Sequence, residues 1–286
     1  MQQSITLQNG LRVVFEPYRS DVVYLGYVVC AGTRDEDDAD SGMAHFIEHM
    51  SFKGTGRRSA RQVISCLERV GGDLNAFTGK EETVYYSTCL RQHVARAVDL
   101  LLDITLDSTY PQEELNREVE VVIDEIESYR VQPSQLIFDD FESLLFPNHP
   151  LGRDILGEKE RLRSYTTADA LRFTQKFYRP DNAVFFVYGD LSFGRIVKTL
   201  DGLFANAATE PVKPVAAEVN RSVAVLPPVA PGVVERERGL HQSHVIMGTR
   251  VFGGDDDRRF ALMLINNILG GPAMNSRFCV SLRDRL

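Results

Sequence analysis

The side chains best suited to catalytic chemistry lie within five consecutive residues, from His45 to His49. The two histidines are four positions apart, so a helix would place both imidazoles on one face, with Glu48 beside them. Two neutral imidazoles at this spacing can hold one Zn²⁺ ion, and the carboxylate can reach a water molecule on that metal. An amphipathic helix that carries two histidines by chance fits the same pattern, so the rest of the chain must decide between the two interpretations.

The order of these residues, His-x-x-Glu-His, is the reverse of the His-Glu-x-x-His zinc-protease motif and is known as the inverzincin signature. An acidic loop at residues 32–42 precedes it. The acids of this loop lack the spacing of a calcium-binding EF-hand, so we interpret the segment as a solvated loop. Ser41, at its end, is placed to cap the helix that would carry His45 and His49.

The composition sets limits on function. The chain has 286 residues, 43% apolar and 25% charged, which is typical of a globular protein long enough for two domains. Its net charge of −8 argues against a nucleic-acid partner, because such a surface needs a basic patch. No apolar run is long enough to span a membrane, and the N-terminus lacks signal-peptide features, so we expect no membrane association and a cytoplasmic location. The four widely spaced cysteines favour buried thiols in a reducing compartment.

The elements that must position the histidines are both strands and helices. Strand patterns, the first of them a hairpin with a turn at Asn9-Gly10, occupy residues 5–17, 22–31, 74–78, 83–88 and 183–188. Helical periodicity marks residues 59–70, 93–107, 113–130, 133–146, 167–177 and 193–204. This arrangement predicts an α+β fold.

The pattern of the first half begins again after residues 211–231, a stretch rich in proline, valine and alanine that we interpret as a linker. Residues 243–250 repeat the order of residues 27–34, an apolar strand followed by Gly-Thr-Arg, and residues 260–267 form an apolar helix where the first copy has its histidines. We therefore predict a catalytic zinc-binding domain at 1–210 and the beginning of a second, homologous domain without zinc at 232–286. The second copy stops where its pattern should continue, which suggests C-terminal truncation.

A catalytic zinc ion usually has three protein ligands and one open position for water. The acidic helix predicted at 113–130 offers the third ligand. Most of its acids belong to a solvated face, but Glu118 and Glu125 are seven positions apart and therefore share one face of the helix.

Together these motifs resemble the pitrilysin/insulinase family of zinc metallopeptidases, especially the branch of mitochondrial processing peptidase and its bacterial relatives. The residues that carry the resemblance extend over nearly the whole chain and are Gly32-Thr33-Arg34, Gly42 to Met50, Phe52-Lys53-Gly54-Thr55, Gly71-Gly72, Asn75-Ala76-Phe77-Thr78, Arg117-Glu118-Val119, Asp124-Glu125-Ile126 and Tyr178 to Asn182. The resemblance implies a mixed β-sheet flanked by helices, followed by the start of a second homologous half.

The resemblance also implies roles for individual residues. The third zinc ligand of the family is a glutamate on a later helix, at a separation from the second histidine that Glu125 matches (125 − 49 = 76). His45, His49 and Glu125 would then hold one Zn²⁺ per chain, and Glu118 would support the site from behind the ligands. Glu48 would be the general base toward a metal-activated water, in an endopeptidase that hydrolyses unfolded peptides or presequences.

Members of this family bind the substrate as an added β-strand along a sheet edge near the metal. By resemblance, Asn75, Ala76 and Phe77 would line that edge, while core packing of Phe77 is an equally good interpretation. Processing peptidases are heterodimers and bacterial relatives are often homodimers, and nothing in the sequence selects between a homologous partner chain and a second copy.

Two alternatives to a peptidase remain open. The family includes non-catalytic partner subunits that lose the zinc site, although the intact His45, Glu48, His49 and Glu125 argue against this interpretation. A structural zinc site without turnover is the other alternative. In the family, a second half supplies an arginine and a tyrosine that stabilise the oxyanion, so we expect these 286 residues alone to bind zinc but to cleave weakly or not at all.

Overall fold

The computed structural model describes residues 1–206, 229, 231–239 and 241–283. Within these residues the chain divides into two compact units. The first unit contains all the described strands, and the second contains the helices α9 (Arg259–Gly270) and α10 (Arg277–Arg283). Apart from residues 229 and 231, the predicted linker at 211–231 lies outside the described residues, so the domain boundaries remain a prediction.

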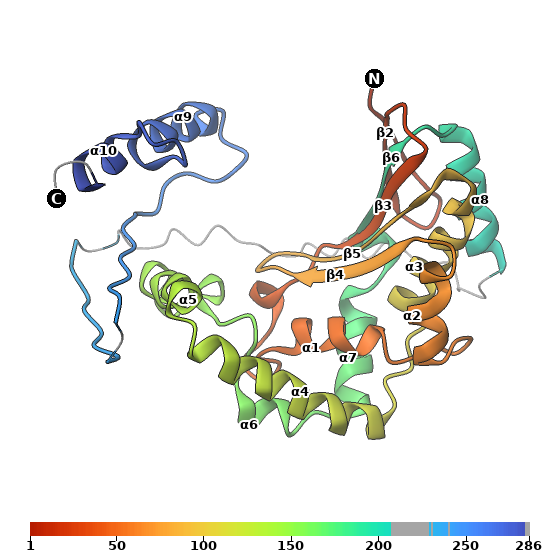
Figure 1. Cartoon of the computed structure of the whole chain (residues 1–286). Coiled ribbons are helices and arrows are strands. Elements are labelled where there is room, and N and C mark those ends of the chain that lie inside the picture. Colours follow the sequence, from red (N-terminus) through yellow and green to blue (C-terminus); the bar gives the residue numbers. More distant parts are fainter. Residues whose placement is uncertain (207–228, 230, 240, 284–286) are drawn as a thin grey trace. The chain divides into compact units, whose positions relative to one another are not determined.

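A six-stranded mixed sheet forms the centre of the first unit (Figure 1). Its strands are β1 (Gln3–Thr6), β2 (Arg12–Pro17), β3 (Val22–Val29), β4 (Asp73–Thr78), β5 (Thr83–Leu90) and β6 (Ala183–Gly189). They lie in the order β1-β2-β6-β3-β5-β4, with β2 and β6 parallel and the other neighbours antiparallel. The predicted α+β class with a mixed sheet is confirmed.

The predicted hairpin at the N-terminus is also confirmed. β1 and β2 pair from Gln3 opposite Phe15 to Thr6 opposite Arg12. Gly10 in the turn has a φ of +89°, and a Cβ at this position would lie 2.6 Å from the Cβ of Asp181. Both the left-handed backbone and the close approach require glycine at this position.

The core lies against one face of the sheet. Side chains alternate between the two faces along a strand, and those on the core face are almost completely buried, as Leu25, Tyr27, Tyr85 and Phe185 show. The opposite face is more open, and Tyr24 on β3 is 48% exposed. The sheet therefore has a packed side and an accessible side.

The helices of the first unit are α1 (Met43–Ser51), α2 (Ala60–Glu68), α3 (Val94–Leu106), α4 (Gln112–Arg130), α5 (Pro133–Leu145), α6 (Lys159–Leu162), α7 (Thr167–Phe177) and α8 (Phe193–Asn206). The sequence-based helices match these bounds closely, except that the short α6 was not predicted. α3 packs on β3 and β5, whereas α1 packs beside β4 and β5 and also contacts α4 and α7 (Figure 1). No described helix is long and apolar enough to cross a membrane.

The described residues after position 240 confirm a predicted helix and correct a predicted strand. α9 includes residues 260–267, as the internal repeat predicts. Residues 243–250 do not form the predicted strand, because they pair with no other described segment and a strand needs a hydrogen-bonded neighbour. The apolar side chains of α9 are exposed, with Phe260 at 65% and Leu264 at 62%.

Candidate metal centre

The acidic loop before α1 fixes the start of the helix that carries the histidines. The Glu36 carboxylate accepts hydrogen bonds from the backbone amides of Gly42 (2.9 Å) and Ala44 (2.8 Å), which have no partner within the helix. The predicted cap by Ser41 is therefore wrong, because Glu36 reaches these amides from the preceding loop. The loop is not fully solvated as predicted either, since Glu36 and Asp40 are buried.

Helix α1 presents His45 and His49 toward Glu125 on α4. The Oε2 atom of Glu125 lies 3.8 Å from Nε2 of His45 and 3.5 Å from Nε2 of His49. The potential ligand atoms of the three residues all lie within 4.8 Å of one another. The structure thus brings together the three residues that the sequence proposes as ligands.

This group fits a zinc ion. Two imidazole nitrogens and one carboxylate oxygen are a donor set that catalytic zinc sites use, with the fourth position left open. Ligand atoms about 2.0–2.2 Å from a tetrahedral zinc lie about 3.3–3.5 Å apart. The observed separations of 3.5 and 3.8 Å between Glu125 and the two histidines are close to these values.

Glu118 contacts His49 on the side of the ring that faces away from Glu125 and so orients this imidazole. Its Oε1 atom lies 3.0 Å from Nδ1 of His49, and its Oε2 atom lies 2.5 Å from Nζ of Lys53. A proton on Nδ1 shared with Glu118 leaves the lone pair of Nε2 directed at the candidate metal position. Sequence reasoning did not assign a role to Lys53, which lies two residues beyond the last residue of α1.

Glu48 lies beside the ligand group and has one direct partner. The Thr78 hydroxyl donates a hydrogen bond to Oε2 of Glu48 over 2.6 Å. Thr78 is the last residue of β4, so this contact ties the carboxylate to the sheet. Sequence reasoning assigned no role to Thr78, because residues 48 and 78 meet only through the packing of α1 against β4.

The residues proposed to bind substrate lie on the same strand. β4 is an edge strand, paired with β5 on one side and with no described strand on the other. Phe77 is 49% exposed and contacts the ring of Tyr86, so the alternative of core packing for Phe77 is wrong. Asn75 and Ala76 precede it on the edge.

The two histidines have opposite electrostatic surroundings. Burial, together with the neighbouring His49, lowers the pKa of His45 to about 4, which keeps that imidazole neutral. Burial also lowers the pKa of His49, but its contacts with Glu118 and Glu125 outweigh this effect and raise the pKa to about 9. Protonation of His49 would therefore compete with a cation for the position between the carboxylates.

The pKa values of Glu48 and Glu118 are shifted in opposite directions. Burial raises the pKa of Glu48, and the Thr78 hydrogen bond opposes this rise only in part. Burial acts in the same direction on Glu118, but the hydrogen bonds from His49 and Lys53 give it a lowered pKa. A carboxyl with a raised pKa next to two ionised carboxylates is typical of a group that exchanges protons during catalysis.

Comparison with known proteins gives two family matches that together cover most of the chain. Residues 12–159 match the model described as insulinase (peptidase family M16), and residues 164–286 match that described as the peptidase M16 inactive domain. The first match contains all the residues of the candidate metal centre.

Curated relatives agree with these matches. The chain is 33% identical over 287 residues to the uncharacterized zinc protease YmxG of Bacillus subtilis, covering 99% of this chain and 67% of that protein. It is 35% identical over 207 residues to the probable mitochondrial-processing peptidase subunit beta of Arabidopsis thaliana, covering 72% of this chain and 39% of that protein. In these two comparisons the chain spans between about two fifths and two thirds of the relative's length.

Solved structures share the fold. A protease from Helicobacter pylori matches with a TM-score of 0.68 and 26% identity, covering 72% of this chain and 50% of that one. A peptidase M16 inactive domain from Pseudomonas fluorescens matches with a TM-score of 0.79 and 20% identity, covering 100% of this chain and 68% of that one.

Proposed function

Since the chain belongs to the insulinase family of peptidases, family M16, we propose that it is a zinc-dependent endopeptidase that cleaves unfolded peptides. The observation that carries the proposal is the convergence of His45, His49 and Glu125, with the Glu48 carboxylate beside them. A zinc site kept only for structure would have no need of a fourth, protonatable group at its open side.

The roles of the residues follow from their positions. His45, His49 and Glu125 would hold the metal, and Glu118 would fix the orientation of His49. When bound, zinc polarises the scissile carbonyl and makes water more acidic. Glu48 is placed to accept a proton from the attacking water and to return it to the leaving amine.

The free edge of β4 suggests how a peptide would be held. An extended peptide that adds to this edge would form main-chain hydrogen bonds with residues 73–78, and Thr78 at its end contacts Glu48. We propose that Asn75, Ala76 and Phe77 line this subsite. Main-chain recognition requires an unfolded segment, because a folded substrate has no free strand to offer.

The proposal includes a homologous partner. The name of the Arabidopsis relative identifies that protein as one subunit of an enzyme, which suggests that this chain pairs with a second copy or with a related chain. A non-catalytic subunit is the second candidate function. The complete ligand set at His45, His49 and Glu125 favours the peptidase over this alternative.

Zinc analysis and peptide cleavage together test the proposal. The purified chain should contain one zinc per molecule, and together with a homologous chain that supplies the second half it should cleave a quenched fluorescent peptide. Glu48→Gln should retain zinc and lose about 10²–10⁴-fold in cleavage rate, whereas His49→Ala should lose the zinc. Glu113→Gln, an exposed position on the same helix as Glu118, is the matched control and should behave like the unmodified chain.

Three outcomes would contradict the proposal. Cleavage that survives in Glu48→Gln would contradict the assignment of Glu48 as the general base. Stoichiometric zinc in His49→Ala would place the metal elsewhere. A zinc-loaded chain that cleaves no peptide, alone or with a homologous chain, would favour the non-catalytic alternative.

A further inference from the structure

A pocket of about 350 Å³ lies in the first unit on elements that carry none of the candidate metal ligands. Four arginines line it, Arg57, Arg58, Arg69 and Arg96, together with polar side chains that include Gln62 and Ser65. We call it the arginine pocket. Its volume is within the range that holds small ligands.

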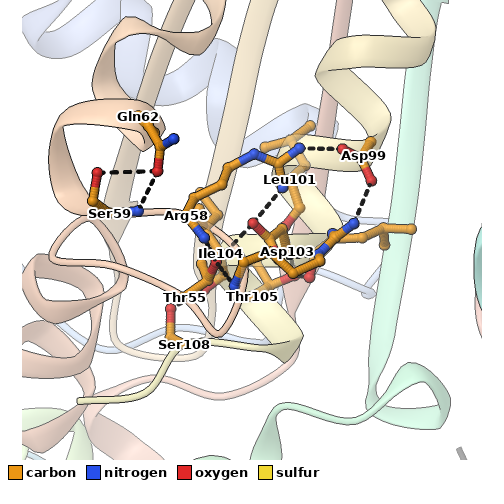
Figure 2. A network of polar contacts seen from close by, with 12 residues as sticks. Thr55, Arg58, Ser59, Gln62, Asp99, Leu101, Asp103, Ile104, Thr105 and Ser108 are labelled. Carbon is orange, nitrogen blue, oxygen red and sulfur yellow. Dashed lines mark hydrogen bonds and ion pairs between the residues drawn. The ribbon is translucent and has the colours of Figure 1, made fainter. Parts of the chain in front are cut away.

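One buried and one partly exposed aspartate fix two of these arginines in place. Asp103 is fully buried and accepts hydrogen bonds from Nε of Arg57 (2.9 Å), from Arg58 and from the hydroxyl of Thr55 (2.9 Å). Asp99 accepts from Nη1 of Arg57 (3.1 Å) and from Arg58. Figure 2 shows Arg58 between the two aspartates. The guanidinium groups are therefore held before any ligand arrives, which lowers the entropic cost of binding.

The arginine pocket keeps a surplus of positive charge. Of the four guanidinium groups, only those of Arg57 and Arg58 form ion pairs with carboxylates of the described residues, in a chain whose net charge is −8. Arg96 donates to the backbone carbonyl of Cys66 over 3.2 Å, which neutralises no charge. The Arg69 side chain forms no hydrogen bond or ion pair within the part of the chain that the structure describes.

Each guanidinium has five N–H donors, and the contacts above use only some of them. Arg57 donates through Nε and Nη1, so Nη2 has no described acceptor. Together with Arg69 and Arg96, this leaves several charged donors around one cavity. Arginine donors in this planar geometry match the oxygens of a phosphate or carboxylate.

We propose that the arginine pocket binds the phosphate group of a small molecule. A phosphate monoester carries about −1.5 to −2 charges at neutral pH and three strong acceptor oxygens, which matches two guanidinium groups without an ion pair, those of Arg69 and Arg96, and donors on several sides. A single carboxylate would compensate only one of these two arginines. The site is separate from peptide hydrolysis, because it is built from α2, α3 and the turn between α1 and α2.

Titration with inorganic phosphate in a calorimeter tests this assignment on the complete chain at constant ionic strength. We expect saturable binding that is about five- to tenfold weaker in Arg69→Gln and in Arg96→Gln. Neither substitution touches the buried aspartates, so both variants should keep the fold, which circular dichroism would verify. Arg61→Gln is the matched control, since Arg61 lies exposed on α2 outside the pocket.

Any of four results would overturn the proposal. The first is the absence of saturable binding up to about 10 mM phosphate. The second is equal binding by the unmodified chain, Arg69→Gln and Arg96→Gln, or an equal loss in Arg61→Gln. The third is binding that disappears when zinc is removed with a chelator, which would assign the anion to the metal centre.

A second titration, with citrate in place of phosphate, separates a phosphate site from a general polyanion site. Tighter binding of citrate than of phosphate is the fourth result, and it would contradict the assignment to phosphate.

Discussion

The hydroxyl of Thr78 donates a hydrogen bond to the carboxylate of Glu48, with 2.6 Å between the two oxygens. This contact joins the last residue of an edge strand to the proposed general base. The same strand end that would position a bound peptide therefore also influences how readily Glu48 gives up its proton, because the hydrogen bond favours the charged carboxylate.

Removal of this hydrogen bond should change the pH dependence of cleavage. In Thr78→Val, burial raises the pKa of Glu48 without the opposing hydrogen bond, so less of the base is ionised at acidic pH. We expect the acid limb of the kcat/KM profile to move to higher pH, with a loss of roughly three- to tenfold at pH 6 and a smaller loss at pH 8. Thr88→Val on β5 is the control. An acid limb that stays in place would show that Thr78 does not act on Glu48.

The hydrogen bond between Glu118 and His49 should contribute to metal affinity. Glu118→Gln keeps the size of the side chain but weakens the charge that orients the imidazole, and we expect zinc to bind about 10–100-fold more weakly. Competition with a chromophoric chelator would measure the affinity. Glu113→Gln on the same helix should leave it unchanged, and equal affinities for both variants would refute the role of Glu118.

The buried aspartate behind the arginine pocket should be a major contributor to stability. Asp103 is fully buried between Arg57 and Arg58, so Asp103→Asn leaves two guanidinium groups short of their counter-charge. We expect a loss of about 3 kcal/mol in the free energy of unfolding. Asp99→Asn, at a partly exposed position, should cost about 1 kcal/mol, and urea denaturation would measure both. A cost at Asp103 no larger than that at Asp99 would contradict the argument.

Asp139 on α5 should lower stability at neutral pH. Burial, with the nearby Asp154, raises its pKa from 3.8 to about 6. The folded chain therefore holds this proton more tightly than the unfolded chain, and stability falls as the pH rises from about 4 to about 6. Because the residue is only half-buried, we expect Asp139→Asn to gain about 1 kcal/mol at pH 7 and nothing at pH 3.5.

Thermal unfolding at the two pH values would measure this difference. Glu68→Gln, an exposed acid on the end of α2, serves as the control and should show no such dependence on pH. An Asp139→Asn variant with the same gain at pH 3.5 and pH 7 would show that its effect does not arise from ionisation.

Local patterns in the sequence predict much of the first unit. The turn at Asn9-Gly10, the periodicity around His45 and the long helix around Glu125 all depend on neighbours a few positions away, and the structure confirms each element. The meeting of Glu125 with the histidines is a long-range event that the spacing on helices could only suggest. The resemblance to a known family selected Glu125 from the other acids.

The contacts that the sequence did not predict have a common physical origin. Glu36 caps α1 from a loop, Thr78 reaches Glu48 from a strand and Lys53 reaches Glu118 from the segment just after α1. Each is a polar contact between separate elements, and polar residues give no periodic signal of burial. The strand predicted at 243–250 failed for the related reason that pairing depends on a neighbour elsewhere in the chain.

The placement of the ligands on α1 and α4 has a consequence for folding. His49 and Glu125 are separated by 76 residues (125 − 49), and an ion that joins them closes a loop of that length. Loop closure restricts the unfolded chain, so part of the metal-binding free energy becomes free energy of folding. The ion would then act as a cross-link between two distant segments, and the rate at which a protease cuts between them would report how much of the protein carries metal.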